Sequence, residues 1–235
     1  MAKRKTRKKT RRQQRLRSLK SRLRWYGFPV AGVLVAVWVT LRFSLLAPDP
    51  PRNPDNLCEI FREHPAWYDY AVESRERWGS PVEVQMAFVY HESSFRSHAQ
   101  PPRTTLLGFI PWTRPSSAYG YAQALDPAWS EYLEAVDGGS LVVRTHIRHA
   151  LDFIGWYNSL SHRHLRIAPD NARQLYLAYH EGRTGYRRGS YRAKPEVSSL
   201  AVRVAARARR YGQQLASCEQ EFQCWRFYEI WPFCG

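Results

Sequence analysis

The residue best suited to chemistry in this 235-residue chain is Glu92, which follows a segment that is apolar almost throughout from Val82 to Tyr90. A helix that is apolar on every side is typically buried. A carboxyl group at its end is therefore partly removed from water, and desolvation disfavours the charged form. Such a carboxyl can stay protonated near neutral pH and donate a proton to a leaving oxygen. The competing interpretation is a surface glutamate that only happens to end a helix.

Two further motifs follow Glu92 along the chain. Residues 92–95 read ESSF, residues 120–123 read GYAQ, and residues 178–182 read AYHEG. Each string is weak alone, but the three in this order resemble the soluble lytic transglycosylases of the lysozyme-like superfamily. The resemblance covers about Asn56 to Tyr211 and implies a mainly α-helical, lysozyme-like domain.

The resemblance also implies an activity, the cleavage of the β-1,4 bond between MurNAc and GlcNAc in peptidoglycan. Glu92 would be the sole catalytic residue, first protonating the glycosidic oxygen and then taking the proton of the sugar's own C6 hydroxyl. The product would be a 1,6-anhydro sugar. Motif positions that orient the acid and hold the N-acetyl group are matched by Ser93, Gln123 and Tyr179. Two further substrate-binding candidates from the same motifs are Tyr121 and His180.

The residue types themselves suit this chemistry. A single acid suffices when a group of the substrate stabilises the charge that develops on the sugar, an exception to the usual pair of carboxylates. Gln123 offers a donor and an acceptor that match an acetamido group, and Tyr179 offers a hydroxyl on an aromatic ring. Structural interpretations compete with both: Gln123 as a turn residue after Gly120, and Tyr179 as a core aromatic of its helix.

The chain departs from the family pattern at two motif positions. Ala122 stands where the family usually has Met, and His180 stands where it usually has Asn. Ala122 could widen the wall of a subsite, and His180 adds a titratable group that could move the pH optimum. The segment between Glu92 and Gly120 is also longer than usual. We interpret residues 101–115 as an insertion that borders the glycan groove or contacts the membrane or another protein.

Two other functions compete with this one. A second carboxylate would make the enzyme a lysozyme-like hydrolase (a muramidase), and the nearest candidates are Asp126, which the sequence favours as a helix cap before Pro127, and Glu181. A catalytically inactive peptidoglycan-binding module is a further alternative, although the retained Glu92 argues against it. Because no P-loop, dinucleotide fingerprint or metal-ligand cluster occurs, no cofactor and no metal are expected.

The N-terminus predicts a membrane anchor. Thirteen Lys and Arg residues and no acid occur in the first 24 positions, and an apolar run from Trp25 to Leu41 follows them. Basic segments stay on the cytoplasmic side of a membrane. We therefore expect a single-pass protein of the bacterial inner membrane with its N-terminus in the cytoplasm and its enzymatic domain in the periplasm. The long basic region and the bulky Leu45 before Leu46-Ala47 argue against a cleaved signal peptide.

The expected partners follow from this location. They are the glycan strands of peptidoglycan and the inner membrane, contacted through residues 25–47 and through the basic tail. Binding of nucleic acid by the tail would leave the exported domain without a function, so no nucleic-acid partner is expected. The sequence leaves partners in the cell-envelope machinery open.

We predict five parts: a basic tail (1–24), a transmembrane anchor (25–47), a Pro-rich linker that acts as a stiff spacer (48–55), the lysozyme-like domain (56–216) and a Cys-rich, aromatic tail (217–235). All four cysteines lie beyond the anchor, where an oxidising compartment favours disulfides. Four cysteines allow three pairings. We predict that Cys58 pairs with one of the three C-terminal cysteines and that the other two pair with each other.

Local signals predict the helices of the domain. Asp55 can cap a short first helix, and residues 80–83 (SPVE) read as a capping box for the apolar helix. Strands are expected only as short pieces between Thr104 and Tyr121. The remaining predicted helices cover residues 65–79, 126–138, 141–160, 170–182 and 195–216.

Overall fold

The computed structural model describes residues 48–106, 110–111 and 113–223, together with Val33, Val35, Val37 and Trp38, and it gives no side-chain description for residues 105–112. The chain divides into two units, Met1–Ala47 and Pro48–Gly235. Only four positions of the expected anchor are described. Among the described residues, no helix has both the length and the apolar character that crossing a membrane requires.

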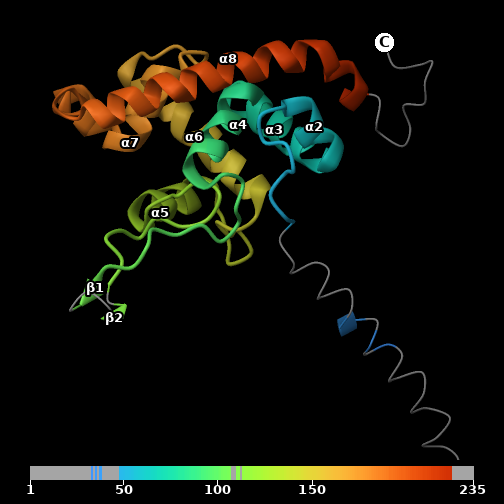
Figure 1. Cartoon of the computed structure of the whole chain (residues 1–235), viewed down its shortest axis with the longest axis horizontal. Helices are drawn as coiled ribbons and strands as arrows, with labels where there is room; N and C mark the ends of the chain where they lie inside the picture. The colour runs from blue at the N-terminus through green and yellow to red at the C-terminus, as the bar shows by residue number, and fades with distance from the viewer. Residues whose placement is uncertain are drawn as a thin grey trace, which may run out of the picture. The chain divides into compact units, whose positions relative to one another are not determined.

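The second unit is mainly α-helical, as predicted (Figure 1). Its elements are α2 (Leu57–Glu63), α3 (Pro65–Trp78), α4 (Val82–Ser93), β1 (Thr105–Leu106), β2 (Ile110–Pro111), α5 (Asp126–Ala135), α6 (Ile147–Leu165), α7 (Ala172–Arg188), the 3-10 helix η1 (Ser190–Ala193) and α8 (Pro195–Gln223). The long α8 runs along one side of the domain, while the β1–β2 hairpin projects from the opposite side near α5. The two short strands pair antiparallel within the predicted stretch.

Helix α4 forms the centre of the core. It packs against α3, α6 and α8, and its residues Met86, Ala87, Phe88 and Val89 are fully buried. Because these helices cover α4 on all sides, α4 needs apolar residues around its whole circumference, and its sequence has no polar face. The prediction of a buried helix leading to Glu92 is confirmed.

Several predicted capping residues were wrong because tertiary partners take over their side chains. Ser80 does not cap α4: its hydroxyl accepts a hydrogen bond from Asn158 at 3.0 Å, and Pro81 occupies the cap position without a side-chain bond. The first helix is capped by Asn56, whose side chain accepts from the Glu59 amide, and not by Asp55. Asp126 is the first residue of α5 and forms an ion pair instead of a cap.

Two other helices differ from their predicted spans. Helix α6 begins at Ile147, after the capping residue His146, because Leu141 is 88% exposed and gains no burial from a helix there. Helix α8 continues beyond residue 216 to Gln223, since its last turns bury Cys218 and Phe222. The C-terminal tail therefore starts later than we predicted.

The N-terminal entry of the domain is fastened to α8, so the second half of the predicted spacer is not free. Arg207 is 7% exposed, pairs with Asp55 at 2.8 Å and donates to the Pro54 carbonyl at 3.1 Å. Its guanidinium carbon lies 3.3 Å from the centre of the Tyr90 ring, a cation–π contact. Tyr211 also donates to the Pro54 carbonyl.

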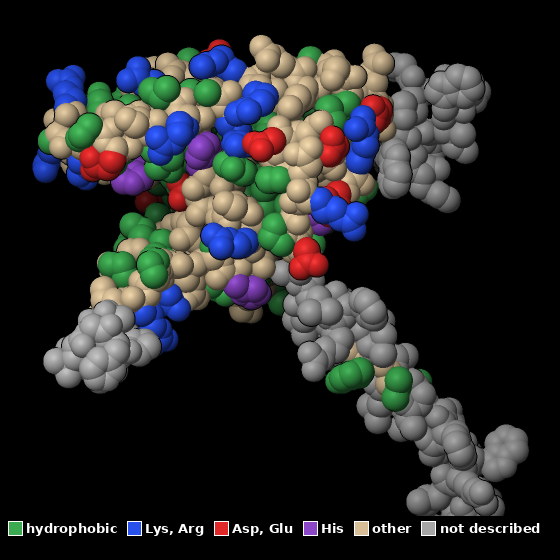
Figure 2. Space-filling model, viewed as in Figure 1, with side chains coloured by type: hydrophobic (Ala, Val, Ile, Leu, Met, Phe, Trp, Pro, Cys, Tyr) green, Lys and Arg blue, Asp and Glu red, His purple; other side chains and the backbone are tan. Residues whose placement is uncertain are grey.

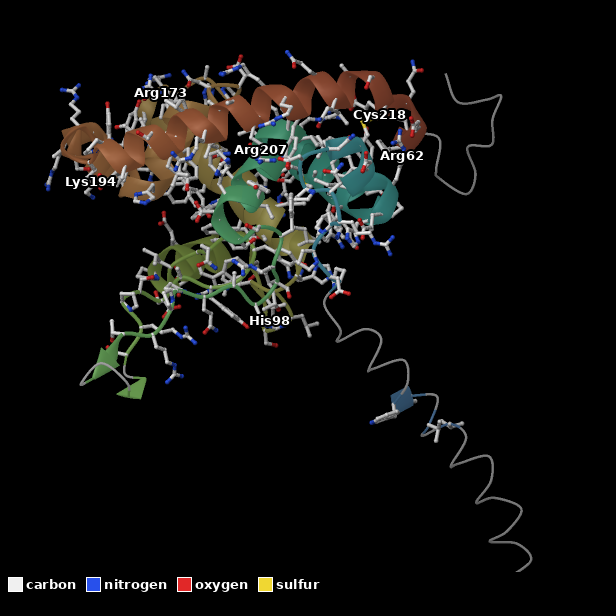
Figure 3. All side chains as sticks on the ribbon, viewed as in Figure 1. Arg62, His98, Arg173, Lys194, Arg207 and Cys218 are labelled. Atoms are coloured by element: carbon white, nitrogen blue, oxygen red, sulfur yellow. A yellow bond between two sulfur atoms is a disulfide. The ribbon has the colours of Figure 1, made fainter. Side chains whose placement is uncertain are left out.

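A disulfide between Cys58 of α2 and Cys218 of α8 reinforces this closure (Figure 3). The predicted link between Cys58 and the C-terminal region is confirmed. The predicted pair Cys224 and Cys234 lies outside the described residues.

Removing this disulfide is expected to destabilise the domain substantially. The bond closes a loop with a sequence separation of 160 residues, and constraining so long a loop reduces the entropy of the unfolded chain, which typically stabilises by about 2–5 kcal/mol. We expect Cys58→Ala/Cys218→Ala to lower the melting temperature by roughly 5–15 °C, measured by circular dichroism against wild type with and without reductant. A double variant with the same melting temperature as the oxidised wild type would contradict this expectation.

Candidate functional site

The acid is presented by a sharp turn at the end of α4. Helix α4 ends at Ser93, and Ser94 and Phe95 both have left-handed backbone angles, with φ of 51° and 59°. The Ser94 amide donates to the Tyr90 carbonyl and closes the helix. Phe95 is fully buried, packed against the rings of Trp67 and Tyr90, and fixes the turn. Glu92 thus occupies the last turn of a rigid, buried helix.

The carboxyl group of Glu92 is held away from water although the residue retains intermediate exposure. Burial raises its pKa to about 7, and a hydrogen bond with the Tyr176 hydroxyl, which favours the charged form, offsets part of that rise. Burial, and next the charge of Glu92, raise the pKa of Tyr176. Tyr176 therefore keeps its proton and acts as the donor in this bond.

Tyr179 also lies close enough to Glu92 for the two groups to interact electrostatically. Burial, and next the negative charge of Glu92, raise its pKa well above the ordinary value. Its hydroxyl donates to the Ala122 carbonyl at 2.5 Å, which joins the AYHEG motif of α7 to the GYAQ motif. Its ring contacts those of Phe88, Phe153 and Tyr157, with centroids 5.4, 6.2 and 5.1 Å away. The core interpretation and the functional interpretation of Tyr179 are therefore compatible.

The GYAQ motif is a tight turn fixed by its backbone. Gly120 has φ of 80°, and a Cβ there would lie 2.2 Å from the Arg144 carbonyl oxygen, so only glycine fits. Gln123 has φ of 48° and its side-chain amide donates to the carbonyls of Ala99 and Gly120, both at 2.8 Å. The side chain therefore supports the turn and also faces a pocket.

That pocket has a volume of about 430 Å³ and lies between α5 and α7. Its lining includes Gln123, Tyr179 and His180, three of the predicted site residues, together with Tyr157 and Arg183. Arg183 pairs with Glu131 at 2.9 Å and lies over the Tyr157 ring. A volume of this size, with aromatic walls and a few polar groups, suits part of a sugar chain.

A larger pocket, of about 680 Å³, opens at the other end of α4. It is lined by Glu83 and Val84 at the start of that helix and by residues of α7 and α8. Glu83 precedes Glu92 by nine positions of the helix, about 13 Å. It contains none of the predicted site residues, so we do not assign it to the site around Glu92.

Two of the predicted substrate contacts need correction. Tyr121 is 0% exposed and packs edge-on against Trp67, so it supports the turn from within the core. Ser93 is 2% exposed and its hydroxyl donates to the Val89 carbonyl of its own helix. Both residues lie too deep in the described fold to touch a ligand directly.

The two candidates for a second carboxylate are both held in ion pairs. Asp126 is exposed and accepts from Arg144 at 2.7 Å. The side chain of Glu181 is 3% exposed and accepts from Lys194 at 2.9 Å, from Ser190 and from His180. Burial alone would raise the pKa of Glu181, but these hydrogen bonds outweigh it and lower the pKa. Both carboxylates are therefore already engaged by basic side chains.

Sequence reasoning missed Tyr176 and Arg183. Tyr176 precedes Tyr179 by three residues, so both lie on one face of α7, and that spacing was the available signal. Arg183 follows Gly182, where φ of 74° and ψ of 156° break the helix. The predicted stop at Gly182 is therefore a kink, after which α7 resumes and brings Arg183 to the pocket.

These features define a class: a helical domain with a desolvated acid at the end of its central helix, beside an aromatic pocket that can hold a polar, ring-shaped ligand. The chain belongs to the transglycosylase SLT domain family, whose model matches residues 31–218. This places it among the lytic transglycosylases of the lysozyme-like superfamily, with peptidoglycan as the implied substrate. No curated protein and no solved structure is significantly similar to it.

Proposed function

We propose that this protein is a membrane-anchored lytic transglycosylase that cleaves the MurNAc–GlcNAc bond and releases a 1,6-anhydro product, with Glu92 as acid and then base. The observation that carries the proposal is the carboxyl of Glu92 itself. Its pKa of about 7 leaves it half protonated at neutral pH, so the same group can give a proton in one step and accept one in the next.

In the first step Glu92 donates its proton to the glycosidic oxygen. The bond between that oxygen and C1 of the MurNAc ring breaks, and its electron pair stays with the leaving GlcNAc hydroxyl. The positive charge that remains on the sugar is stabilised by the substrate's own acetamido group, for which Gln123 and Tyr179 are the proposed supports in the adjoining pocket. His180, which lines the same pocket, is a further proposed contact.

In the second step the Glu92 carboxylate takes the proton of the C6 hydroxyl, and that oxygen bonds to C1. The acid is restored and no water is consumed. Tyr176 supports this step because its hydrogen bond stabilises the transient carboxylate. Hydrolysis needs a second free carboxylate to activate water or to attack the sugar. Because Asp126 and Glu181 are both held in ion pairs, the structure favours the transglycosylase route.

The proposed location is the periplasmic side of a bacterial inner membrane, with residues 25–47 as the anchor. Its support is the basic tail followed by an apolar run in the sequence. The disulfide between Cys58 and Cys218 agrees with an oxidising compartment.

Product analysis tests the proposed reaction. Purified peptidoglycan sacculi are digested with the full-length protein, and the soluble fragments are identified by mass spectrometry. Fragments that end in 1,6-anhydro sugars are expected, 18 mass units lighter than the hydrolysis products because no water is added. Fragments with reducing ends would instead establish a lysozyme-like hydrolase and overturn the transglycosylase mechanism.

A further inference from the structure

Charge is distributed unevenly in the folded domain. Between residues 163 and 210 the chain has twelve Lys and Arg residues but only three Asp and Glu residues, a net charge of +9. All residues after position 24 together carry only +3, so the remainder of the chain beyond the tail is net negative. In Figure 2 the basic side chains gather along α8 and at the end of the domain where α7 meets α8.

Three of the basic residues at this end are not neutralised. We define the basic corner as Arg187, Arg188 and Arg192, which lie on the last turn of α7 and on η1 and are all exposed. Within the described part of the chain, none of the three forms an ion pair with an acid. Lys194 beside them is already engaged, because both of its contacts at 2.9 Å are to the buried carboxylate of Glu181.

The corner is rigidly built. Glu181 connects α7 to η1 through its bond from Ser190 and to the start of α8 through Lys194. The rings of Tyr186 and Tyr191 stack with centroids 5.5 Å apart and planes 25° apart, one from each side of the turn. The three arginines therefore project from a fixed support, which lowers the entropic cost of binding a ligand.

The corner continues the wall of the pocket beside Glu92. Gly182, Arg183 and Gly185 line that pocket, and Arg187 and Arg188 follow Gly185 within one helical turn. A polymer that fills the pocket and extends along α7 must pass the corner. This continuity favours a ligand that is also a substrate over a separate surface such as a membrane.

We propose that the basic corner binds the carboxylates of the peptide stems that peptidoglycan strands carry, and so selects peptide-bearing stretches of glycan for cleavage. This inference rests on the proposed function, because it takes peptidoglycan as the polymer in the pocket. The guanidinium group suits the task, since its planar set of N–H donors binds a carboxylate through two parallel hydrogen bonds. A stripped glycan strand keeps only the lactyl carboxylate of each MurNAc ring, which lies close to the sugar backbone and not at the end of an extended peptide.

Sedimentation with purified sacculi tests the corner. The full-length protein carries Glu92→Gln in every sample, so that strands stay intact during the measurement. Into this background we place Arg187→Gln/Arg188→Gln/Arg192→Gln. An exposed ion pair changes affinity by about 1.4- to 5-fold, so the triple variant should bind native sacculi roughly tenfold more weakly. On sacculi whose carboxyl groups have been amidated, both proteins should bind equally.

The matched control is Arg163→Gln/Arg173→Gln/Arg210→Gln. It removes the same number of charges from exposed arginines that lie between residues 163 and 210 but outside the basic corner. Arg173 lies in the first turn of α7, on the other side of the kink at Gly182 from Arg187 and Arg188. The control should bind native sacculi within about twofold of its parent. The basic tail is common to all samples and cancels in the comparison.

Several results would overturn the inference. One is equal binding of native sacculi by the corner variant and the control. Another is a binding defect of the corner variant that persists on amidated sacculi. Lost binding to anionic phospholipid vesicles with unchanged binding to sacculi would assign the corner to lipid and also overturn it. Should the triple variant unfold, the three single substitutions, each expected to lose about twofold, carry the same comparison. Failure of the parent to bind any sacculi would instead contradict the proposed function.

Discussion

Glu92→Gln is expected to reduce cleavage of peptidoglycan by at least a thousandfold. General acid–base catalysis contributes about 10²–10⁴ to a rate, and Glu92 would act in both steps of the proposed reaction. Glutamine keeps the shape of the side chain but can neither give nor take the proton. The measurement is the release of soluble fragments from sacculi, quantified by chromatography against the wild-type protein.

The same substitution should leave the fold intact or make it more stable. The pKa of Glu92 in the folded protein is about 7, above its ordinary 4.5, so the folded state holds the proton more tightly than the unfolded chain does. The contribution of Glu92 to stability is therefore full below pH 4.5 and is lost as the pH rises through 7, by up to about 3 kcal/mol. Glutamine never acquires that charge, so the variant should melt at or above the wild-type temperature at pH 8.

Glu83→Gln is the matched control, since Glu83 lies in the first turn of the same helix α4. It should keep wild-type cleavage. If Glu92→Gln and Glu83→Gln were equally active, Glu92 would not be the catalyst. An inactive Glu92→Gln that also fails to fold would contradict the stability expectation and would leave Glu92→Asp as the variant for the catalytic test.

The sequence predicted the centre of the fold and the acid because both depend on local signals. Helix α4 has no polar face, and a helix of that kind has nowhere to lie except inside the core. The position of Glu92 at its last turn then determines its desolvation. The resemblance to the family added Gln123 and Tyr179, and the structure places both on the wall of one pocket.

Contacts between distant helices could not be predicted in the same way. Ser80 has the right spacing for a capping box, yet Asn158 in α6 takes its hydroxyl. Glu181 adjoins the Tyr179 motif, but the kink at Gly182 turns the chain so that Lys194 and Ser190 reach it. A side chain's choice among partners depends on packing angles that no single segment determines.

Tyr176 illustrates the same limit at the site itself. Its spacing from Tyr179 places both on one face of α7, but the sequence did not say that this face meets the end of α4. Phe88 supplies the missing contact, because its ring packs edge-on against both Tyr176 and Tyr179, with centroids 5.2 and 5.4 Å away. Packing on Phe88 brings the Tyr176 hydroxyl to the Glu92 carboxyl.

The second large effect is expected in the pH dependence of cleavage. Only the protonated form of Glu92 can act as the acid, and its pKa of about 7 means that this form decreases above neutral pH. The value of kcat/KM should fall about tenfold per pH unit above 7, so that roughly one hundredth remains at pH 9. Initial rates on solubilised glycan strands between pH 5 and pH 9 measure this decline.

Tyr176→Phe should move the decline to higher pH. The Tyr176 hydroxyl stabilises the carboxylate form of Glu92, and its removal leaves burial unopposed, which raises the pKa of Glu92 further. A hydrogen bond to a charged group is worth about 1.5–3 kcal/mol, enough to shift the midpoint by about one to two pH units. The ratio of the cleavage rate at pH 8 to the rate at pH 6 should therefore be higher for the variant than for the wild type.

Tyr68→Phe is the control for this shift, because it removes a tyrosine hydroxyl that bonds to Glu219 instead of Glu92. Its pH profile should coincide with that of wild type. A wild-type midpoint near 4.5 would mean that Glu92 behaves as an ordinary carboxyl in solution. A midpoint near 7 that does not respond to Tyr176→Phe would assign the titration to another group and remove the tyrosine from the mechanism.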